Sequence, residues 1–164
     1  DGTSSEVAGG ATSVSATAES APVLVVEDHP VHARLITKAL EECSLFKVSV
    51  AATGAAAVES LAASDETACA RPRLVLLDYY LPDMSGLNVL RHIRSQPRLR
   101  TMPVVILSSE DRESVVAECL EAGANAFVLK ATHFDDFHRS VTRAAIFWTS
   151  ECQIPGPFAS QPVS

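Results

Sequence analysis

Apolar residues along the chain form short runs that alternate with longer stretches of helical periodicity. The runs are rich in Val, Leu and Ile, and each is followed by a stretch whose apolar positions recur every three or four residues. This pattern predicts strands over 22–26, 46–50, 73–78, 103–108 and 125–129, and helices over 30–43, 53–64, 86–95, 111–123 and 132–148. Five strand–helix units favour a parallel sheet with helices on both faces.

The same spacing assigns a buried face to several of these helices. Those faces consist of Val31, Leu35, Ala39 and Cys43 in the first helix, Val115, Val116, Cys119 and Leu120 in the fourth, and Phe134, Phe137, Val141 and Trp148 in the fifth. Helix ends carry their own signals: Thr53 suits an N-cap and Gly123 a C-terminal stop. Thr132 and Asp135 have the spacing of a capping box, so we expect the last helix to begin at Thr132.

Both ends of the chain depart from this alternation. In residues 1–21, 16 of the 21 are Ser, Thr, Gly or Ala, and none is Lys or Arg. Such a segment buries too little apolar surface to offset its ordering entropy, so we expect a flexible N-terminal tail. Residues 151–164 contain three prolines, which exclude a helix and predict a C-terminal tail suited to be an interface arm. The single expected domain is 22–150.

Charge and cysteine content narrow the class of protein. A formal net charge of −7 argues against nucleic acid or a membrane surface as a partner, because both need clustered Lys and Arg. No apolar run approaches the roughly 18 residues of a membrane span, and the N-terminus lacks the features of a signal peptide. The four cysteines lie far apart without a CxxC pair, which favours reduced thiols over zinc or disulfides. We expect a cytoplasmic protein.

Polar residues stand where four of the five predicted strands end. Glu27 and Asp28 follow the first strand, Asp78 ends the third, Ser108 ends the fourth and Lys130 follows the fifth. The strand order is open between the flavodoxin-like 2-1-3-4-5 and half of a dinucleotide-binding fold. In either arrangement ligands bind at the carboxyl ends of the strands, so these side chains are expected to converge there.

Convergence of three carboxylates at one point predicts a cation among them, because they otherwise repel and raise each other's pKa. Mg²⁺ suits carboxylate oxygens and leaves room for a phosphoryl group. Lys130 and Ser108 supply a cation and a hydroxyl for phosphoryl oxygens, and Asp78 is then the expected nucleophile, forming an aspartyl phosphate.

Four segments carry a family resemblance: "LVVEDHP", "LVLLDYYLPDMSGLNVL", "PVVILSS" and "GANAFVLK". Together they resemble the receiver domain of two-component response regulators, over about residues 22–148. The resemblance implies a flavodoxin-like (βα)5 three-layer sandwich with strand order 2-1-3-4-5. It also implies a partner histidine kinase, and no enzymatic activity beyond self-catalysed phosphorylation and dephosphorylation.

The resemblance also implies roles for single residues. Asp78 is the phosphoacceptor, and Mg²⁺ is held by Glu27, Asp28, Asp78 and the backbone carbonyl of Tyr80. Ser108 and Phe127 form the switch pair, and Lys130 is the lysine that contacts the phosphoryl group. Tyr80 and Glu110 stand at two positions that tune hydrolysis in the family. One departure is Lys130-Ala131, where the family usually has Lys-Pro, often with a cis bond that costs about 2.5–4 kcal/mol without proline.

The segment "AIFWTSECQIP" is similar to regulators that work with bacterial and cyanobacterial phytochrome histidine kinases. It places Phe147 and Trp148 at the end of the last helix, where exposed apolar side chains mark an interface. We expect a homodimer through the fourth helix, fifth strand and fifth helix, with the C-terminal tail contributing. The alternative for Phe147 and Trp148 is a plug at the base of the helix.

Two other functions fit part of the pattern. A haloacid dehalogenase-type phosphohydrolase also uses a strand-end Asp with Mg²⁺, but it needs a second acid where Tyr80 stands. Ala131 suggests a pseudo-receiver that binds partners without phosphorylation. The complete set of acids, hydroxyl and lysine argues against that alternative. The pairs His29/His32 and His133/His138 lack a third metal ligand at useful spacing, and the arginines of "RHIRSQPRLR" predict a solvated face.

Overall fold

The structure, a computed structural model, describes residues 20–64, 71–130 and 132–149. Its strands are β1 (Ala21–Val26), β2 (Phe46–Ala51), β3 (Leu74–Asp78), β4 (Val104–Ser108) and β5 (Ala126–Leu129). Its helices are α1 (Pro30–Glu41), α2 (Gly54–Ala63), α3 (Gly86–Ser95), α4 (Glu113–Glu121) and α5 (Phe134–Thr149). Every expected element is present, with ends within two residues of the prediction. The predicted tails lie outside the described residues, apart from residues 20 and 21.

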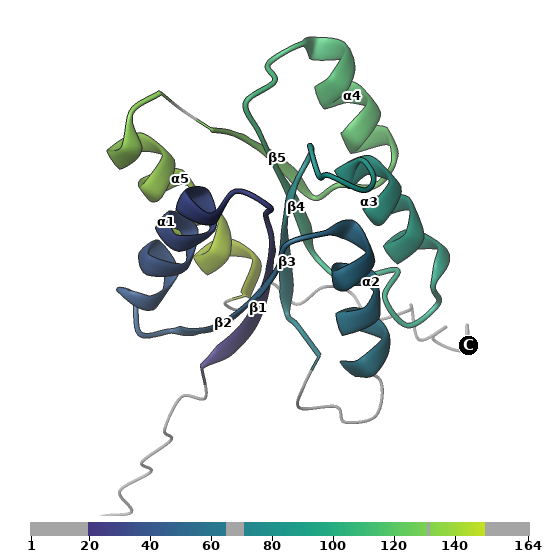
Figure 1. The fold of residues 1–164 in the computed structure, drawn as a ribbon, viewed down its shortest axis with the longest axis horizontal. Helices are drawn as coiled ribbons and strands as arrows, with labels where there is room; N and C mark the ends of the chain where they lie inside the picture. Colours follow the sequence, from purple (N-terminus) through teal and green to yellow (C-terminus); the bar gives the residue numbers. More distant parts are fainter. Residues whose placement is uncertain (1–19, 65–70, 131, 150–164) are drawn as a thin grey trace, which may run out of the picture.

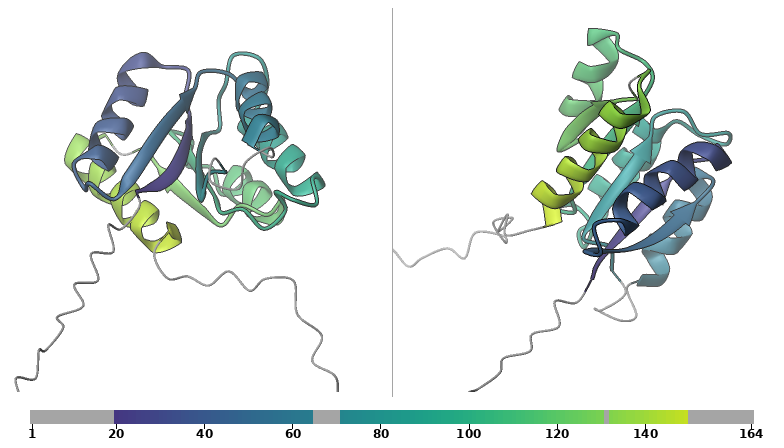
Figure 2. Two further views of the ribbon diagram at one scale, coloured as in Figure 1. Left: turned by 90° about the horizontal axis from the view of Figure 1, so that it is seen from below. Right: turned by 90° about the vertical axis from the view of Figure 1, so that its left-hand side faces the viewer.

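The five strands form one parallel sheet in the order β2-β1-β3-β4-β5. This order confirms the flavodoxin-like arrangement and excludes the half-dinucleotide alternative. Helices α1 and α5 cover one face of the sheet, while α2, α3 and α4 cover the other (Figure 1). Seen from below, the sheet lies between the two helix layers (Figure 2).

The core consists of two clusters, one on each face of the sheet. The central strands β3 and β4 are buried along their whole length, which explains why their sequences are continuous apolar runs rather than alternating ones. Leu74 and Leu76 point into the α1–α5 cluster, whereas Val75 and Leu77 point into the cluster under α2–α4. Each such side chain contributes about 1.5–3 kcal/mol by burial.

The face that α1 buries differs from the predicted one. Its fully buried residues are Ile36, Ala39 and Leu40, and Leu35 and Cys43 are only half-buried. Val31 is 56% exposed, so its assignment to the core was wrong. The buried residues of α1 all lie in its second half, where Ile36 and Leu40 join the core cluster on this face of the sheet. Cys43 lies past the helix end, while Cys119 is buried as expected; both thiols are free.

The predictions for α4 and α5 also need correction at two positions. Leu120 is 48% and Phe134 44% exposed, although both were assigned to buried faces. The Phe134 ring instead lies edge-on to His138, with ring centroids 5.8 Å apart. Helix α5 begins at Phe134, two residues later than the capping-box pattern indicated, and it packs through Phe137, Val141 and Ala145. Of the rest of the α4 stripe, Val115 and Cys119 are buried, whereas Val116 is half-buried.

Two helix-end signals are confirmed. The Thr53 side chain accepts a hydrogen bond of 3.0 Å from the Ala56 N–H at the start of α2. Gly123 ends α4 with φ of +101°, in the left-handed region that favours glycine.

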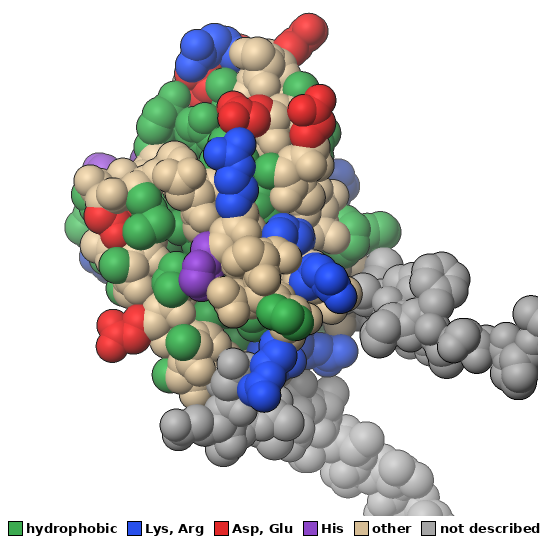
Figure 3. Space-filling model, turned by 90° about the vertical axis from the view of Figure 1, so that its right-hand side faces the viewer, with side chains coloured by type: hydrophobic (Ala, Val, Ile, Leu, Met, Phe, Trp, Pro, Cys, Tyr) green, Lys and Arg blue, Asp and Glu red, His purple; other side chains and the backbone are tan. Residues whose placement is uncertain are grey.

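The arginines of α3 and the following loop do not all form a solvated face. Arg91, Arg98 and Arg100 are exposed, and basic side chains are visible on the face formed by α2–α4 (Figure 3). Arg94 instead donates hydrogen bonds to the carbonyls of Met102 (2.8 Å) and Gly123 (2.7 and 2.9 Å) and to Asn125 Oδ1 (2.9 Å). It therefore ties α3 to the loops that precede β4 and β5.

None of the helices in the described ranges has the length and apolar character needed to cross a bilayer.

Candidate functional site

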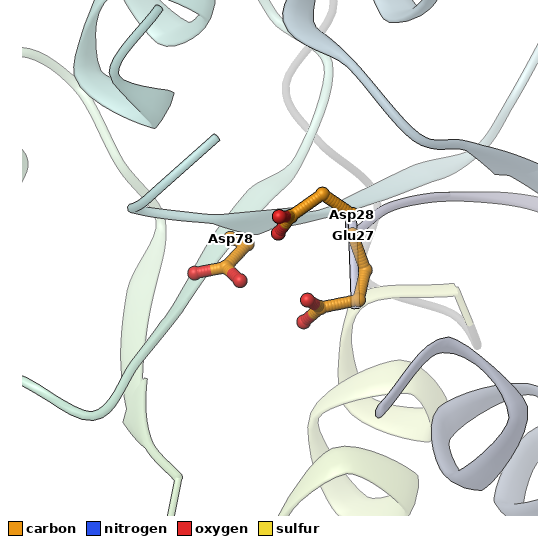
Figure 4. Close-up of side chains that lie close together, drawn as sticks. All are labelled: Glu27, Asp28 and Asp78. Carbon is orange, nitrogen blue, oxygen red and sulfur yellow. The ribbon is translucent and has the colours of Figure 1, made fainter. Parts of the chain in front are cut away.

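Three carboxylates meet where β1 and β3 end. Glu27 and Asp28 directly follow β1, and Asp78 is the last residue of β3, its neighbour in the sheet. One oxygen from each carboxylate lies within 4.8 Å of the others, and the three side chains come together in Figure 4. Glu27 and Asp78 are 2% and 5% exposed, whereas Asp28 is exposed to solvent. The sequence prediction that these acids converge agrees with this arrangement.

The chain around Asp78 fixes its carboxylate tightly. The Tyr80 N–H donates a hydrogen bond of 3.1 Å to Asp78 Oδ1, and the Gly86 N–H donates one of 2.7 Å to the Tyr79 carbonyl. Gly86 packs directly against the backbone of Asp78, since a Cβ at this position would overlap the Asp78 carbonyl oxygen. A buried strand thus delivers Asp78 to the sheet edge, and a close-packed glycine turns the chain away behind it.

Lys130 neutralises part of this negative charge. Its Nζ lies 2.6 Å from Glu27 Oε2 and 2.8 Å from Asp78 Oδ2. Burial by itself would lower the pKa of Lys130, but the hydrogen bonds and charges of Asp78 and Glu27 raise the pKa above its ordinary value. The lysine is therefore charged at any physiological pH, and it bridges the two buried carboxylates.

The site carries more negative charge than one lysine balances. Burial raises the pKa of Glu27 from 4.5 to about 7, and the Asp78 charge adds to this, while the hydrogen bond and charge of Lys130 oppose it. All-oxygen ligands with an excess of negative charge are the donor set that Mg²⁺ prefers, so the residues fit the expected ion.

Ser108 ends β4 and is fully buried. Its Oγ accepts a hydrogen bond of 3.0 Å from the Glu110 N–H, and its carbonyl accepts one of 2.7 Å from the Lys130 N–H. Phe127 pairs with Ile106 in the register of β4 and β5, and it is half-buried against the cluster under α2–α4. Ser108, at the end of β4, thus lies beside Lys130, and Phe127 lies on the neighbouring edge strand β5. Ala131 lies outside the described residues, so the conformation expected after Lys130 is not tested.

Several contacts around the site were not anticipated from the sequence. The Tyr80 hydroxyl donates a hydrogen bond of 3.1 Å to Glu110 Oε2, and Glu110 Oε1 lies 2.9 Å from Arg112 Nε. Asp83 accepts hydrogen bonds of 2.9 and 2.8 Å from the N–H groups of Gly54 and Ala55. The Tyr80–Glu110 contact and the contacts of Asp83 with the start of α2 join segments 28 to 30 positions apart, which is why no local pattern indicated them.

The aromatic pair at the end of α5 is divided between surface and core. Phe147 is 58% exposed, whereas Trp148 is half-buried and packs against the α1–α5 cluster. Their rings meet edge to face with centroids 5.0 Å apart. The sequence left two alternatives for this pair, an interface and a plug at the base of the helix. Trp148 is half-buried, as a plug would be, whereas Phe147 presents an apolar ring at the surface.

Comparison with known proteins agrees with this geometry. Residues 23–142 match the sequence model of the family described as "Response regulator receiver domain". The Oryza sativa subsp. japonica protein "Two-component response regulator ORR5" is 33% identical over 121 residues, which cover 74% of this chain and 86% of that protein.

Two solved structures are also similar. The Mn(2+)-bound form of response regulator Rcp1 has a TM-score of 0.73 and 28% identity, covering 83% of this chain and 99% of that one. The phosphorylated cyanobacterial phytochrome response regulator RcpA has a TM-score of 0.74 and 30% identity, covering 84% and 99%. The family match spans most of the chain, and the strand order and the strand-end residues agree with it, so this chain belongs to the response regulator receiver domain family.

Proposed function

We propose that this receiver domain accepts a phosphoryl group from a histidine kinase on Asp78, with Mg²⁺, and signals by a change in its protein-contact surface. The observation that carries the proposal is Lys130 bridging the buried Glu27 and Asp78 carboxylates at 2.6 and 2.8 Å, with Asp28 alongside. A buried carboxylate, an ammonium group and spare negative charge at one edge of the sheet support this proposal. A structural salt bridge would not need the second and third acid.

The proposed reaction uses these residues as follows. An Asp78 carboxylate oxygen attacks the phosphorus of a phosphohistidine; the new O–P bond forms, the N–P bond breaks, and its electron pair stays on the imidazole. Glu27, Asp28, Asp78 and the Tyr80 carbonyl would hold Mg²⁺, which supplies charge neutralisation on the transferring group. Lys130 leaves Asp78 to meet a phosphoryl oxygen, and Ser108 is placed to donate its hydroxyl to another.

The switch follows from the same contacts. The phosphoryl group adds a charge of about −1.5 to −2, and Ser108 lies on the neighbouring strand with its hydroxyl near the loop after β4. Movement of Ser108 toward that charge would open space on the β4–β5 side, which half-buried Phe127 is placed to fill. The expected result is a changed surface over α4, β5 and α5.

The kinase is proposed to be of the phytochrome type. Support comes from the similarity over 84% of this chain to RcpA, which is described as a cyanobacterial phytochrome response regulator. The Phe-Trp ending of α5 adds to this, because it was the feature of the sequence that resembled such regulators.

Incubation with acetyl phosphate and Mg²⁺, followed by intact-mass measurement, tests the function. A stable gain of about 80 Da supports a phosphoacceptor. Release of phosphate without an adduct would instead support the dehalogenase-type hydrolase, although Tyr80 occupies the place of its second acid. If the protein neither forms an adduct nor releases phosphate, the result would indicate a pseudo-receiver.

Mg²⁺ affinity is expected to weaken as the pH falls through about 7, because protonation of Glu27 removes charge from the site. The folded-state pKa is raised to about 7, so the deprotonated form that favours the ion is complete only above that value. The dissociation constant should rise by up to about tenfold per pH unit below 7 and level off above it. Titration with Mg²⁺, followed by thermal unfolding or calorimetry, measures this.

Two variants serve as controls for the metal prediction. Glu27→Gln should flatten the pH dependence, and Asp28→Asn should weaken binding more than Glu27→Gln does. An affinity that stays constant between about pH 5.5 and 7 would contradict the assignment of the titrating group to this site.

A homodimer through α4, β5 and α5 is proposed on the exposed apolar side chains of these elements. Leu120, Leu129 and Phe147 are 48%, 45% and 58% exposed, and an isologous contact would bury each against the partner copy. Phe147→Ala is expected to weaken the dimer about tenfold, as loss of a central aromatic does. Sedimentation or light scattering measures this.

Leu45→Ala is the matched control, because Leu45 is similarly exposed (49%) but lies in the α1–β2 connection. Removal of residues 150–164 tests the proposed contribution of the C-terminal segment. A monomer at tens of micromolar for the intact chain, on the order of typical assay concentrations, would refute the dimer.

A further inference from the structure

Lys130 has a third neighbour besides the two carboxylates. His32 Nδ1 lies 3.5 Å from Lys130 Nζ and 3.9 Å from Glu27 Oε1. An ammonium group has three N–H donors and no acceptor, and Glu27 and Asp78 take two of them. His32 stands at the third, at the outer limit of hydrogen-bond distance. Neither sequence pattern nor family resemblance gave this histidine a role.

The local structure holds the imidazole in place. His32 is the third residue of α1, in the turn that begins with Pro30, so its backbone is fixed by the helix. Its ring stacks on the ring of His29, with centroids 4.4 Å apart. The helix itself is fixed to the sheet through Ile36 and Leu40. His32 therefore faces Lys130 from the first turn of α1, whereas Asp78 comes from the end of β3.

The chemistry of the contact requires a neutral ring. Nδ1 accepts from Lys130 only when the imidazole is neutral and carries its proton on Nε2. Partial burial, followed by the charge of Lys130, lowers the pKa of His32, which agrees with a neutral ring at neutral pH. A neutral acceptor can contact the ammonium group without competing with a phosphoryl oxygen as a fourth carboxylate would.

We infer that His32 is a positioning residue for Lys130, an inference that rests on the proposed phosphoryl transfer to Asp78. During transfer the ammonium must leave Asp78 Oδ2, which lies 2.8 Å away, to meet a phosphoryl oxygen. Glu27 and His32 are the two remaining neighbours of the ammonium group, and the inference is that both contacts are kept during this movement. Glu27 attracts the ammonium group by its charge, and His32 accepts from its third N–H. Together they keep Lys130 Nζ close to Asp78 while it moves to the phosphoryl oxygen.

The test compares two replacements of His32 in the full chain. His32→Leu keeps similar volume but removes the acceptor, whereas His32→Asn places Oδ1 close to the position of Nδ1. We expect His32→Leu to slow the maximal rate of adduct formation from acetyl phosphate about fivefold at saturating Mg²⁺, the effect of losing one hydrogen bond. The acetyl phosphate concentration at half-maximal rate should stay unchanged, and His32→Asn should restore the rate to within about twofold.

Controls separate positioning from a general effect on the fold. His92→Leu makes the same replacement in α3, on the opposite face of the sheet, and should leave the rate unchanged. Thermal unfolding of each variant identifies any loss of structure. A His32→Leu rate equal to the wild-type rate, or a His32→Asn rate as slow as that of His32→Leu, would overturn the inference.

A measurement without phosphoryl transfer keeps the inference apart from the proposed function. Nitrogen-15 NMR of histidine-labelled protein should find the Nε2–H tautomer at His32, with an Nδ1 signal that shifts in Lys130→Met. The Nδ1–H tautomer would overturn the Lys130 contact whatever the kinetics. Wild-type protein that forms no adduct, while His32 has the expected tautomer, would overturn the proposed function and leave the contact standing.

Discussion

Asp78→Asn is expected to abolish the gain of about 80 Da that the wild-type chain shows with acetyl phosphate and Mg²⁺. An amide oxygen is a poor nucleophile, and the replacement also removes one of the two carboxylates that hold Lys130. The expected loss is complete within the sensitivity of mass spectrometry, which corresponds to at least about a hundredfold decrease in rate, or roughly 2.7 kcal/mol. The effect is larger than that of any other replacement proposed for the site.

The fold should survive this replacement. Asn is nearly isosteric with Asp, and Lys130 keeps its contact of 2.6 Å with Glu27, so the unfolding free energy should change by no more than about 1 kcal/mol. Asp83→Asn is the matched control, since Asp83 lies five positions after Asp78, in the loop that follows β3, and accepts hydrogen bonds from the start of α2. The Asp83→Asn protein should form the adduct at the wild-type rate. An adduct on the Asp78→Asn protein at the wild-type rate would place the phosphoacceptor elsewhere.

Gly86→Ala is expected to destabilise the protein by about 3 kcal/mol or more, through overlap of backbone atoms that cannot move apart. The added Cβ would overlap the Asp78 carbonyl oxygen and lie 2.9 Å from Tyr79 Cα. Relief requires the start of α3 to move away from the end of β3, which would break the 2.7 Å hydrogen bond from Gly86 to the Tyr79 carbonyl. Because that movement displaces Asp78 itself, adduct formation should fall with stability.

Gly54→Ala tests the same argument with a different neighbour. There the new Cβ would overlap Met84 Cγ and would lie 2.7 Å from Met84 Sδ and 3.0 Å from Val89 Cγ2. A methionine side chain adjusts at small cost, so we expect about 1 kcal/mol or less. Urea unfolding of both variants measures the difference. Equal losses of stability would show that backbone overlap behind Asp78 is not the cause.

The sequence by itself determined the strands, the helices and a parallel sheet covered by helices on both faces. Residues 74–77 and 104–107 are continuously apolar because β3 and β4 are covered on both faces of the sheet. It also indicated the residues of the site. Parallel strands end at one edge, so Glu27, Asp28, Asp78, Ser108 and Lys130 had to lie near each other once the sheet formed.

Helix faces were less certain from sequence, because periodicity gives the spacing of a face but not its rotation toward the sheet. In α1 both the predicted set and the observed set recur at helical spacing, and packing selected Ile36 and Leu40 over Val31. Phe134 and Leu120 show the same limit, since each continues a periodic stripe beyond the area that the sheet and neighbouring helices cover.

Only the tertiary structure decided which polar groups pair. Lys130 is separated from Glu27 by 103 positions and from Asp78 by 52, and no local pattern encodes whether an ammonium group reaches one carboxylate or two. Arg94 was assigned to a solvated face, yet it donates to carbonyls of the loops before β4 and β5. His32 reaches Lys130 across 98 positions. Propensity and periodicity act within a few residues, whereas hydrogen bonding and charge neutralisation depend on distances in space, which the packed sheet and helices alone set.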